Sequence, residues 1–314
     1  MRFHMGNSGF VRFLCICLMF LSACTHTSKR EGSKTKLPWE SPARHLREAK
    51  VSEPVLLRLK GDPKRIEKVA YTHRMRSTSY EDLEVRHQKE ELLDFLAQAE
   101  TLNVGADGER FTQRITVLKK EGSANLHDFA MPEVGERLDV VADSRGRIIR
   151  SGNYPENSIF YVPPNSLPEE AVKVGDTWSM EASWVSLDEN VPYRLDMVSI
   201  MKRFLECGKD RCAEIEVAGE VSLQGPLAQA MVFKSMWRGF ILFNIDAGAV
   251  VWSRVDSEEQ LMAGNVRRSV TSCLEAAMVE PAELKVPTDE KPCAVLSEPG
   301  EITPPPAPMT ANET

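Results

Sequence analysis

The sequence has no apolar run long enough to form a membrane-spanning helix in its N-terminal region. The apolar stretch at residues 13–21 has about nine residues, whereas a helix needs roughly 20 to cross the hydrocarbon core of a bilayer. A permanent transmembrane helix is therefore not expected there.

Histidine is scarce, and none follows His127. A Ser-His-Asp or Cys-His site would have to take its base from the first half of the chain. The sequence also lacks His-Glu-x-x-His, Gly-x-Ser-x-Gly, Cys-x-x-Cys and a phosphate-binding glycine loop, and no cofactor or metal site is predicted. The remaining candidate for acid–base chemistry is His127 beside Asp128, although the pattern favours a loop histidine next to a capping aspartate.

Basic residues are fewer than acidic ones, with 39 Lys and Arg against 46 Asp and Glu. Residues 1–23 contain Arg2 and Arg12 and no acid, so the rest of the chain is more acidic than the whole. An acidic protein is a poor electrostatic partner for nucleic acid or for an anionic membrane surface. Neither is predicted as a charge-driven partner.

The N-terminus has the three parts of an export signal, which are a positive start, a short apolar core and small residues before a cleavage point. It ends in Leu21-Ser22-Ala23-Cys24, which resembles the lipobox of bacterial lipoproteins. This resemblance implies that the signal is cut before Cys24 and that Cys24 carries the acyl chains. Two or more chains make a stable anchor, whereas one is reversible.

The same resemblance implies a place in the cell. In that family an Asp after the modified Cys often signals retention in the inner membrane, and here Thr25 follows Cys24. We therefore expect the periplasmic face of the outer membrane. An ordinary secretory signal with an incidental cysteine is the alternative, since Cys15 and Cys17 also occur inside the apolar run.

Composition divides the chain into six segments. The tether is polar and basic, and the tail is rich in Pro, Glu and Thr, so neither can bury enough apolar surface to order itself. The predicted segments are a lipoprotein signal peptide (1–23), a flexible tether (24–50), a first β-rich lobe (51–153), a proline-rich link (154–170), a second β-rich lobe (171–280) and a disordered proline-rich tail (281–314).

The sequence predicts that both lobes are antiparallel β meanders. Alternating apolar and polar residues and β-branched runs indicate strands, and turns such as Asp143-Ser144-Arg145-Gly146 separate them. The predicted fold is mainly β, arranged as two lobes or half-barrels, with an α+β fold as the alternative. Residues 81–100 fit a helix by composition and a strand by alternation. The sequences on both sides have strand-like patterns, which favours the strand.

Val174-Gly175-Asp176-Thr177-Trp178 resembles a strand opening found in uncharacterised exported β-rich bacterial proteins. The long meanders also resemble, at the level of the fold, the open half-barrels of periplasmic lipoprotein carriers. This second resemblance implies an apolar inner face, but it does not identify a ligand.

Four cysteines remain beyond Cys24. Cys207 and Cys212 enclose four residues, a good length for a hairpin, and a disulfide across it is favoured over a redox-active pair or free thiols. Cys273 and Cys293 would then form a second local bridge, which the spacing leaves open. An exported chain meets an oxidising compartment in which such bonds persist.

Taken together, these features predict a non-enzymatic envelope protein, anchored to the membrane by lipid, that binds a hydrophobic ligand or an envelope protein or has a structural role. The alternative is a hydrolase acting on envelope polymers, with paired carboxylates or His127 as its acid–base groups.

Overall fold

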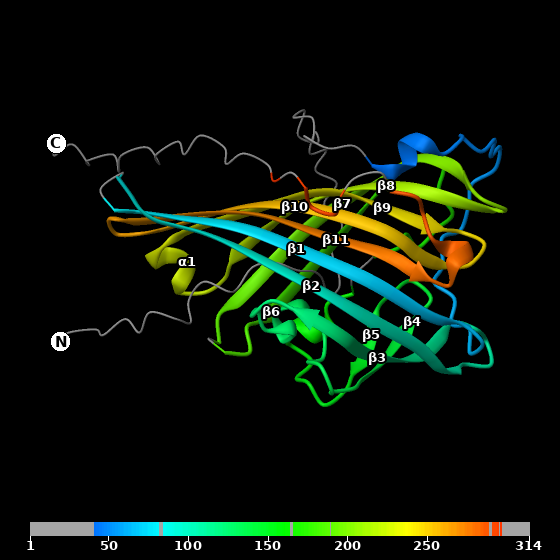
Figure 1. Cartoon of the computed structure of the whole chain (residues 1–314), viewed down its shortest axis with the longest axis horizontal. Coiled ribbons are helices and arrows are strands. Elements are labelled where there is room, and N and C mark those ends of the chain that lie inside the picture. The colour runs from blue at the N-terminus through cyan, green and yellow to red at the C-terminus, as the bar shows by residue number, and fades with distance from the viewer. Residues whose placement is uncertain are drawn as a thin grey trace, which may run out of the picture.

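Eleven antiparallel strands form one sheet in the computed structural model, which describes residues 41–81, 84–163, 166–188, 190–288, 291–294 and 296 (Figure 1). The strands are β1 (Ile66–Glu81), β2 (Glu84–Val104), β3 (Arg110–Glu121), β4 (Leu138–Asp143), β5 (Ile148–Ser151), β6 (Thr177–Val185), β7 (Pro192–Cys207), β8 (Asp210–Leu223), β9 (Val232–Asn244), β10 (Ala249–Ala263) and β11 (Val266–Glu280). The short helices are η1 (Pro42–His45), η2 (Leu126–Phe129), η3 (Ile159–Tyr161), α1 (Leu227–Ala230) and η4 (Ala282–Leu284).

Local sequence explains most of these strands. The predicted turn between β4 and β5 forms, and Gly146 adopts a positive φ of 87° that a residue with a Cβ rarely takes. The ambiguous stretch at residues 81–100 is a strand over its described part. Alternation decides it, because Leu93, Phe95 and Ala97 are buried on one face while their neighbours are more exposed.

The two halves of the chain are joined in one sheet. The strand order is β5-β4-β3-β2-β1-β11-β10-β9-β8-β7-β6. Each half is a meander, as predicted, but β1 pairs along most of its length with β11, from Lys68 opposite Glu280 to Glu81 opposite Val266. The expectation of two separate lobes is therefore corrected to two halves of a single open sheet with β5 and β6 at its edges.

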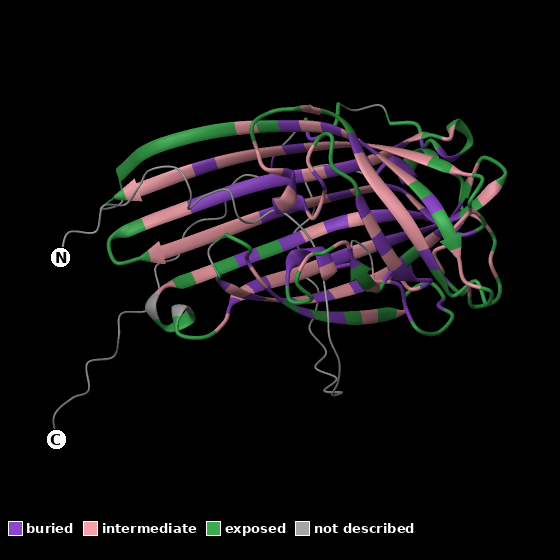
Figure 2. Ribbon diagram, turned by 90° about the horizontal axis from the view of Figure 1, so that it is seen from below, coloured by how far each residue is buried: buried purple, intermediate pink, exposed green. Residues whose placement is uncertain are grey.

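The sheet curls so that one face turns inward (Figures 1 and 2). Leu138 of β4 and Trp184 of β6, which lie near opposite edges of the strand order, belong to the same buried core cluster. We call the face that carries Leu195, Trp237 and Phe95 the inner face and the opposite one the outer face. The described residues contain no helix with the length and apolarity needed to cross a membrane.

The connection between β5 and β6, predicted as a link between lobes, instead fills the gap between the two edges. Leu167 N donates to Arg145 O in the β4–β5 turn, and Val185 N of β6 donates to Asn157 O. Ile159 and Phe160 are buried in the main core. Covering both edge strands in this way protects backbone groups that could otherwise pair with another chain.

Parts of the predicted tether and tail pack against the outer face. Ala43 of η1 is fully buried in a cluster with Leu284 and Val286, which follow β11. Residues 47–49 also form backbone hydrogen bonds with the end of β7. The described portions of these two segments thus belong to the folded body, and Cys24 lies outside the described residues.

Candidate functional site

The inner face provides a continuous apolar surface. Strict alternation on β6 to β9 places every second side chain there, in rows that cross the sheet, such as Ala182, Leu195 and Val221. All three are buried. The outer face of the same strands carries ion pairs, for example Arg194 with Glu181 and with Asp196. On these strands the two faces therefore differ in polarity.

One half of the inner face is filled by the chain itself. Leu57, Phe160 and Val172 lie in the same core cluster as the inner residues of β4 and β6 to β9. On the β1–β2 side, Phe129 of η2 packs edge-on against Phe95 and against His73. This half of the interior is a solid core.

The other half lies toward α1 and the β10–β11 turn, and its inner side chains are only partly covered. Met75 of β1, Phe233 of β9 and Leu261 of β10 occupy inner positions and are half-buried. Side chains on β9 alternate between the two faces. The outer residues Val232 and Met236 are 50% and 37% exposed, whereas Phe233 between them is half-buried. Apolar side chains at inner positions therefore continue beyond the solid core toward the β10–β11 turn.

Several polar side chains interrupt this partly covered surface, including the hydrogen-bonded pair Ser257 and Ser272. Ser77 of β1, Arg268 of β11, Glu259 of β10 and Ser235 of β9 all occupy inner positions. The Arg268 guanidinium donates to Ser77 Oγ from Nε at 3.1 Å and from Nη2 at 2.8 Å. We call these four residues the inner polar cluster.

Burial shapes the charge of this cluster. It raises the pKa of Glu259 to about 8, against the opposing effect of Arg268. It also lowers the pKa of Arg268 itself, against Glu259 and Glu91. Ser235 is fully buried, and its hydroxyl has no hydrogen-bond partner among the described residues. At neutral pH the cluster thus holds a guanidinium, two hydroxyls and a carboxyl that favours its protonated form.

The predicted acid–base candidate lies elsewhere, on η2. His127 Nε2 is 3.0 Å from Glu136 Oε2 and 3.2 Å from the Tyr154 hydroxyl, and its ring meets Phe160 edge-on. Tyr154 stacks on Phe160 in turn. These contacts fix η2 to the connection that fills the gap between the edges. The described residues contain no group of three or more His, Cys, Asp or Glu arranged to hold a metal ion.

The structure joins the four cysteines in the two local pairs. Cys207 and Cys212 bridge the end of the β7–β8 hairpin, and Cys273 of β11 is bonded to Cys293, with a Cα–Cα distance of 5.8 Å in each pair. Both pairs lie away from the inner polar cluster. Cys273 occupies an outer position, so the second bridge fastens the C-terminal segment to the outer face.

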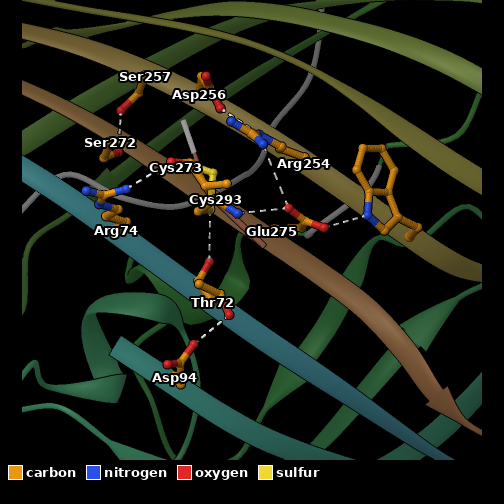
Figure 3. Close-up of a disulfide and its surroundings, with 12 residues drawn as sticks. Thr72, Arg74, Asp94, Arg254, Asp256, Ser257, Ser272, Cys273, Glu275 and Cys293 are labelled. Carbon is orange, nitrogen blue, oxygen red and sulfur yellow. Dashed lines mark hydrogen bonds and ion pairs between the residues drawn. A yellow bond between two sulfur atoms is a disulfide. The ribbon is translucent and has the colours of Figure 1, made fainter. Parts of the chain in front are cut away.

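A buried ionic network lies beneath that segment (Figure 3). Glu275 accepts from Trp252 Nε1 at 2.9 Å and from the Cys293 backbone N at 3.2 Å. Arg254 donates to Asp256 at 3.1 Å, and its Nη1 lies 3.9 Å from Glu275. All of these side chains are nearly inaccessible to solvent. The network and the disulfide anchor the described part of the C-terminal segment on the outer face.

Sequence reasoning missed the inner polar cluster. Val266–Glu280 alternates weakly, and Arg267 next to Arg268 looks like an ordinary charged strand end. The pairing of β1 with β11 determines which of the two arginines faces inward. The sequence did contain one indication, since Arg268 lies two and six residues before Val270 and Leu274 and so shares their face of the strand. That this face is the inner one was evident only from the structure.

Comparison with known proteins gives no family. No family model matches the chain, and no curated protein matches it. Similar solved structures include the attachment invasion locus protein Ail of Yersinia pestis in complex with the heparin analogue sucrose octasulfate, at 7% identity over 68% of this chain and 98% of that one, with a TM-score of 0.17. An outer membrane channel from Pseudomonas putida F1 has 8% identity over 74% and 100% of the two chains, with a TM-score of 0.20. Likenesses at this level carry no argument about the present chain.

Proposed function

We propose that this protein is a non-enzymatic envelope protein, anchored by lipid at Cys24 to the periplasmic face of the outer membrane, that binds a hydrophobic ligand on its inner face. The supporting observation is the partly covered apolar surface around Met75, Phe233 and Leu261, which continues from a solid core toward the β10–β11 turn.

The physical reason is the hydrophobic effect. Burying apolar surface releases about 25 cal/mol for each square ångström removed from water. A half-buried Phe or Leu at an inner position still has area to lose, and the curled sheet presents several of them side by side. On the outer face, ion pairs such as Arg194 with Asp196 and the segments that carry Ala43 and Leu284 cover much of the sheet, so we expect ligand binding on the inner side.

Binding of an uncharged fluorescent probe tests the proposal. We expect N-phenyl-1-naphthylamine to fluoresce more strongly when it is mixed with the full chain, because its fluorescence rises in an apolar environment. Phe233→Asp places a charge in the inner surface and should reduce the binding by about tenfold or more. Met236→Asp, on the outer face of the same strand, is the matched control and should bind like the wild type.

Leu261→Asp on β10, with Met262→Asp as its outer-face control, repeats the comparison on a second strand. Thermal unfolding of all four variants separates loss of binding from loss of folding. Equal effects of the inner and outer substitutions, or no probe binding by the wild type, would refute binding at the inner face.

Anchoring is tested separately in cells. Growth with radioactive palmitate should label the wild-type chain, and Cys24→Ser should abolish the label and release the protein from the membrane fraction. Label that persists in Cys24→Ser would place the acyl chains elsewhere. Cys15→Ser is the control, since Cys15 lies within the apolar part of the signal.

A further inference from the structure

We propose that the inner polar cluster binds the anionic headgroup of an amphiphile, whose apolar tail lies along Phe233 and Leu261. The inference rests on the proposed function and specifies the chemical class of its ligand: a molecule with a long hydrocarbon part and one carboxylate or phosphate group.

Arg268 is the residue that we expect to bind the anionic headgroup. Its guanidinium has five N–H donors, and the hydrogen bonds that the structure gives it are the two to Ser77 Oγ. No described carboxylate forms an ion pair with it. Glu259 and Glu91 act on the guanidinium electrostatically without forming an ion pair with it. A guanidinium that has lost part of its hydration without a directly paired carboxylate is costly, and its planar fork matches a carboxylate or phosphate.

The surrounding groups are suited to an anion as well. Ser77 is 3% exposed, and its hydroxyl lies at the guanidinium. The Ser235 hydroxyl is buried without a partner and can donate to an incoming oxygen. Glu259 lies between them in register, opposite both Val270 and Ser235. A carboxyl there that keeps its proton adds a donor and does not repel an anion.

Position explains why the anion should belong to an amphiphile. Arg268 lies directly opposite Leu261 on the inner face, and Leu261 lies opposite Phe233. A headgroup at Arg268 therefore has its tail's binding surface one and two strands away. A small inorganic anion would use the guanidinium but leave that apolar surface exposed.

Three ligands with the same tail test the inference. Oleate and monooleyl phosphate carry an anionic head, and oleyl alcohol does not. We expect the full chain to bind at least one of the anions about tenfold or more tightly than the alcohol, as measured by calorimetry or displacement of N-phenyl-1-naphthylamine. The tighter of the two anions identifies the headgroup as carboxylate or phosphate.

Arg268→Gln should remove the preference by weakening anion binding and leaving alcohol binding unchanged. Arg268→Lys, which keeps the charge without the planar fork, should give an intermediate result. Arg267→Gln is the matched control, because the adjacent side chain faces outward. An unchanged ratio of anion to alcohol affinity in Arg268→Gln would overturn the inference while the proposed function stands. Failure of the wild type to bind any of the three would overturn both.

Discussion

Glu259 of β10 lies directly opposite Ser235 of β9 on the inner face of the sheet. Beyond Ser235, the same row continues through Val221, Leu195 and Ala182. Two adjacent polar side chains thus follow three apolar ones in this row, which continues to Val270 of β11 and Ser77 of β1, and neither Ser235 nor Glu259 belongs to an ion pair among the described residues. The inner positions are therefore apolar in this row on β6 to β8, whereas β9 and β10 contribute the polar pair.

We expect Glu259→Gln to stabilise the fold above neutral pH. Burial raises the pKa of Glu259 from 4.5 to about 8, so over this range the folded state holds a proton that the unfolded state releases. Wild-type stability should therefore fall as pH rises through this window. Gln cannot ionise, so the variant should match the wild type near pH 4 and exceed it at pH 9, as measured by urea unfolding.

Glu258→Gln provides the control for that measurement, because Glu258 occupies the outer face of the same strand. The prediction fails if the advantage of Glu259→Gln does not grow between pH 4 and pH 9, or if Glu258→Gln shows the same growth.

His73 should make the fold sensitive to mild acid. Burial lowers its pKa from 6.5 to about 4, so the unfolded chain binds a proton between these values and the folded one does not. The wild type should lose about 3 kcal/mol from this group as pH falls from above 6.5 to below 4.

His73→Gln removes that loss and reduces the slope of unfolding free energy against pH in this interval. It also loses the edge-on contact with Phe129, which lowers stability at every pH. His87→Gln, at an exposed position of β2, should leave the slope unchanged. Equal slopes in the wild type and His73→Gln would show that His73 titrates in the same way folded and unfolded.

The two disulfides should contribute unequally. The Cys273–Cys293 bridge spans 20 residues in sequence and the Cys207–Cys212 bridge spans 5. Loop-closure entropy then gives about 3 kcal/mol for the longer loop and about 2 kcal/mol for the shorter. Double Cys→Ala variants of each pair, compared by urea unfolding, should preserve this order. A larger loss for Cys207 and Cys212 would contradict it.

Arg254 should be among the residues that tolerate substitution least. Its replacement by Leu removes the cation that pairs with Asp256 and lies 3.9 Å from Glu275 in the buried network, which we expect to cost about 3–5 kcal/mol of unfolding free energy. Arg47→Leu removes an exposed ion pair with Glu206 and should cost at most about 1 kcal/mol. Similar losses in the two variants would mean that the Arg254 network is solvated in solution.

Local patterns in the sequence predicted the strands and turns because they depend on neighbouring residues. Leu93, Phe95 and Ala97 show this, since their alternation outweighs the helix-favouring composition of residues 81–100. The mainly β, antiparallel meander is accordingly confirmed.

Contacts between distant segments were not predictable in the same way. Nothing near Thr72 indicates that Glu275 lies opposite it, and this pairing merges the two expected lobes. Ile159 and Phe160 lie in a proline-rich stretch whose composition is typical of a linker. They are nevertheless buried, because they pack in the core between the two edges of the curled sheet. The inward direction of Arg268 depends on the same long-range register.

The pairing of β1 with β11 sets the order in which the chain can acquire its structure. Hairpins such as β1–β2 and β7–β8 need only nearby residues, but β1 has its second neighbour in the last strand. Closing so long a loop is slow, and a chain appears N-terminus first as it is made. One edge of β1 therefore stays unpaired until almost all of the polypeptide has been made, and a truncation that removes β11 leaves that edge of β1 unpaired permanently.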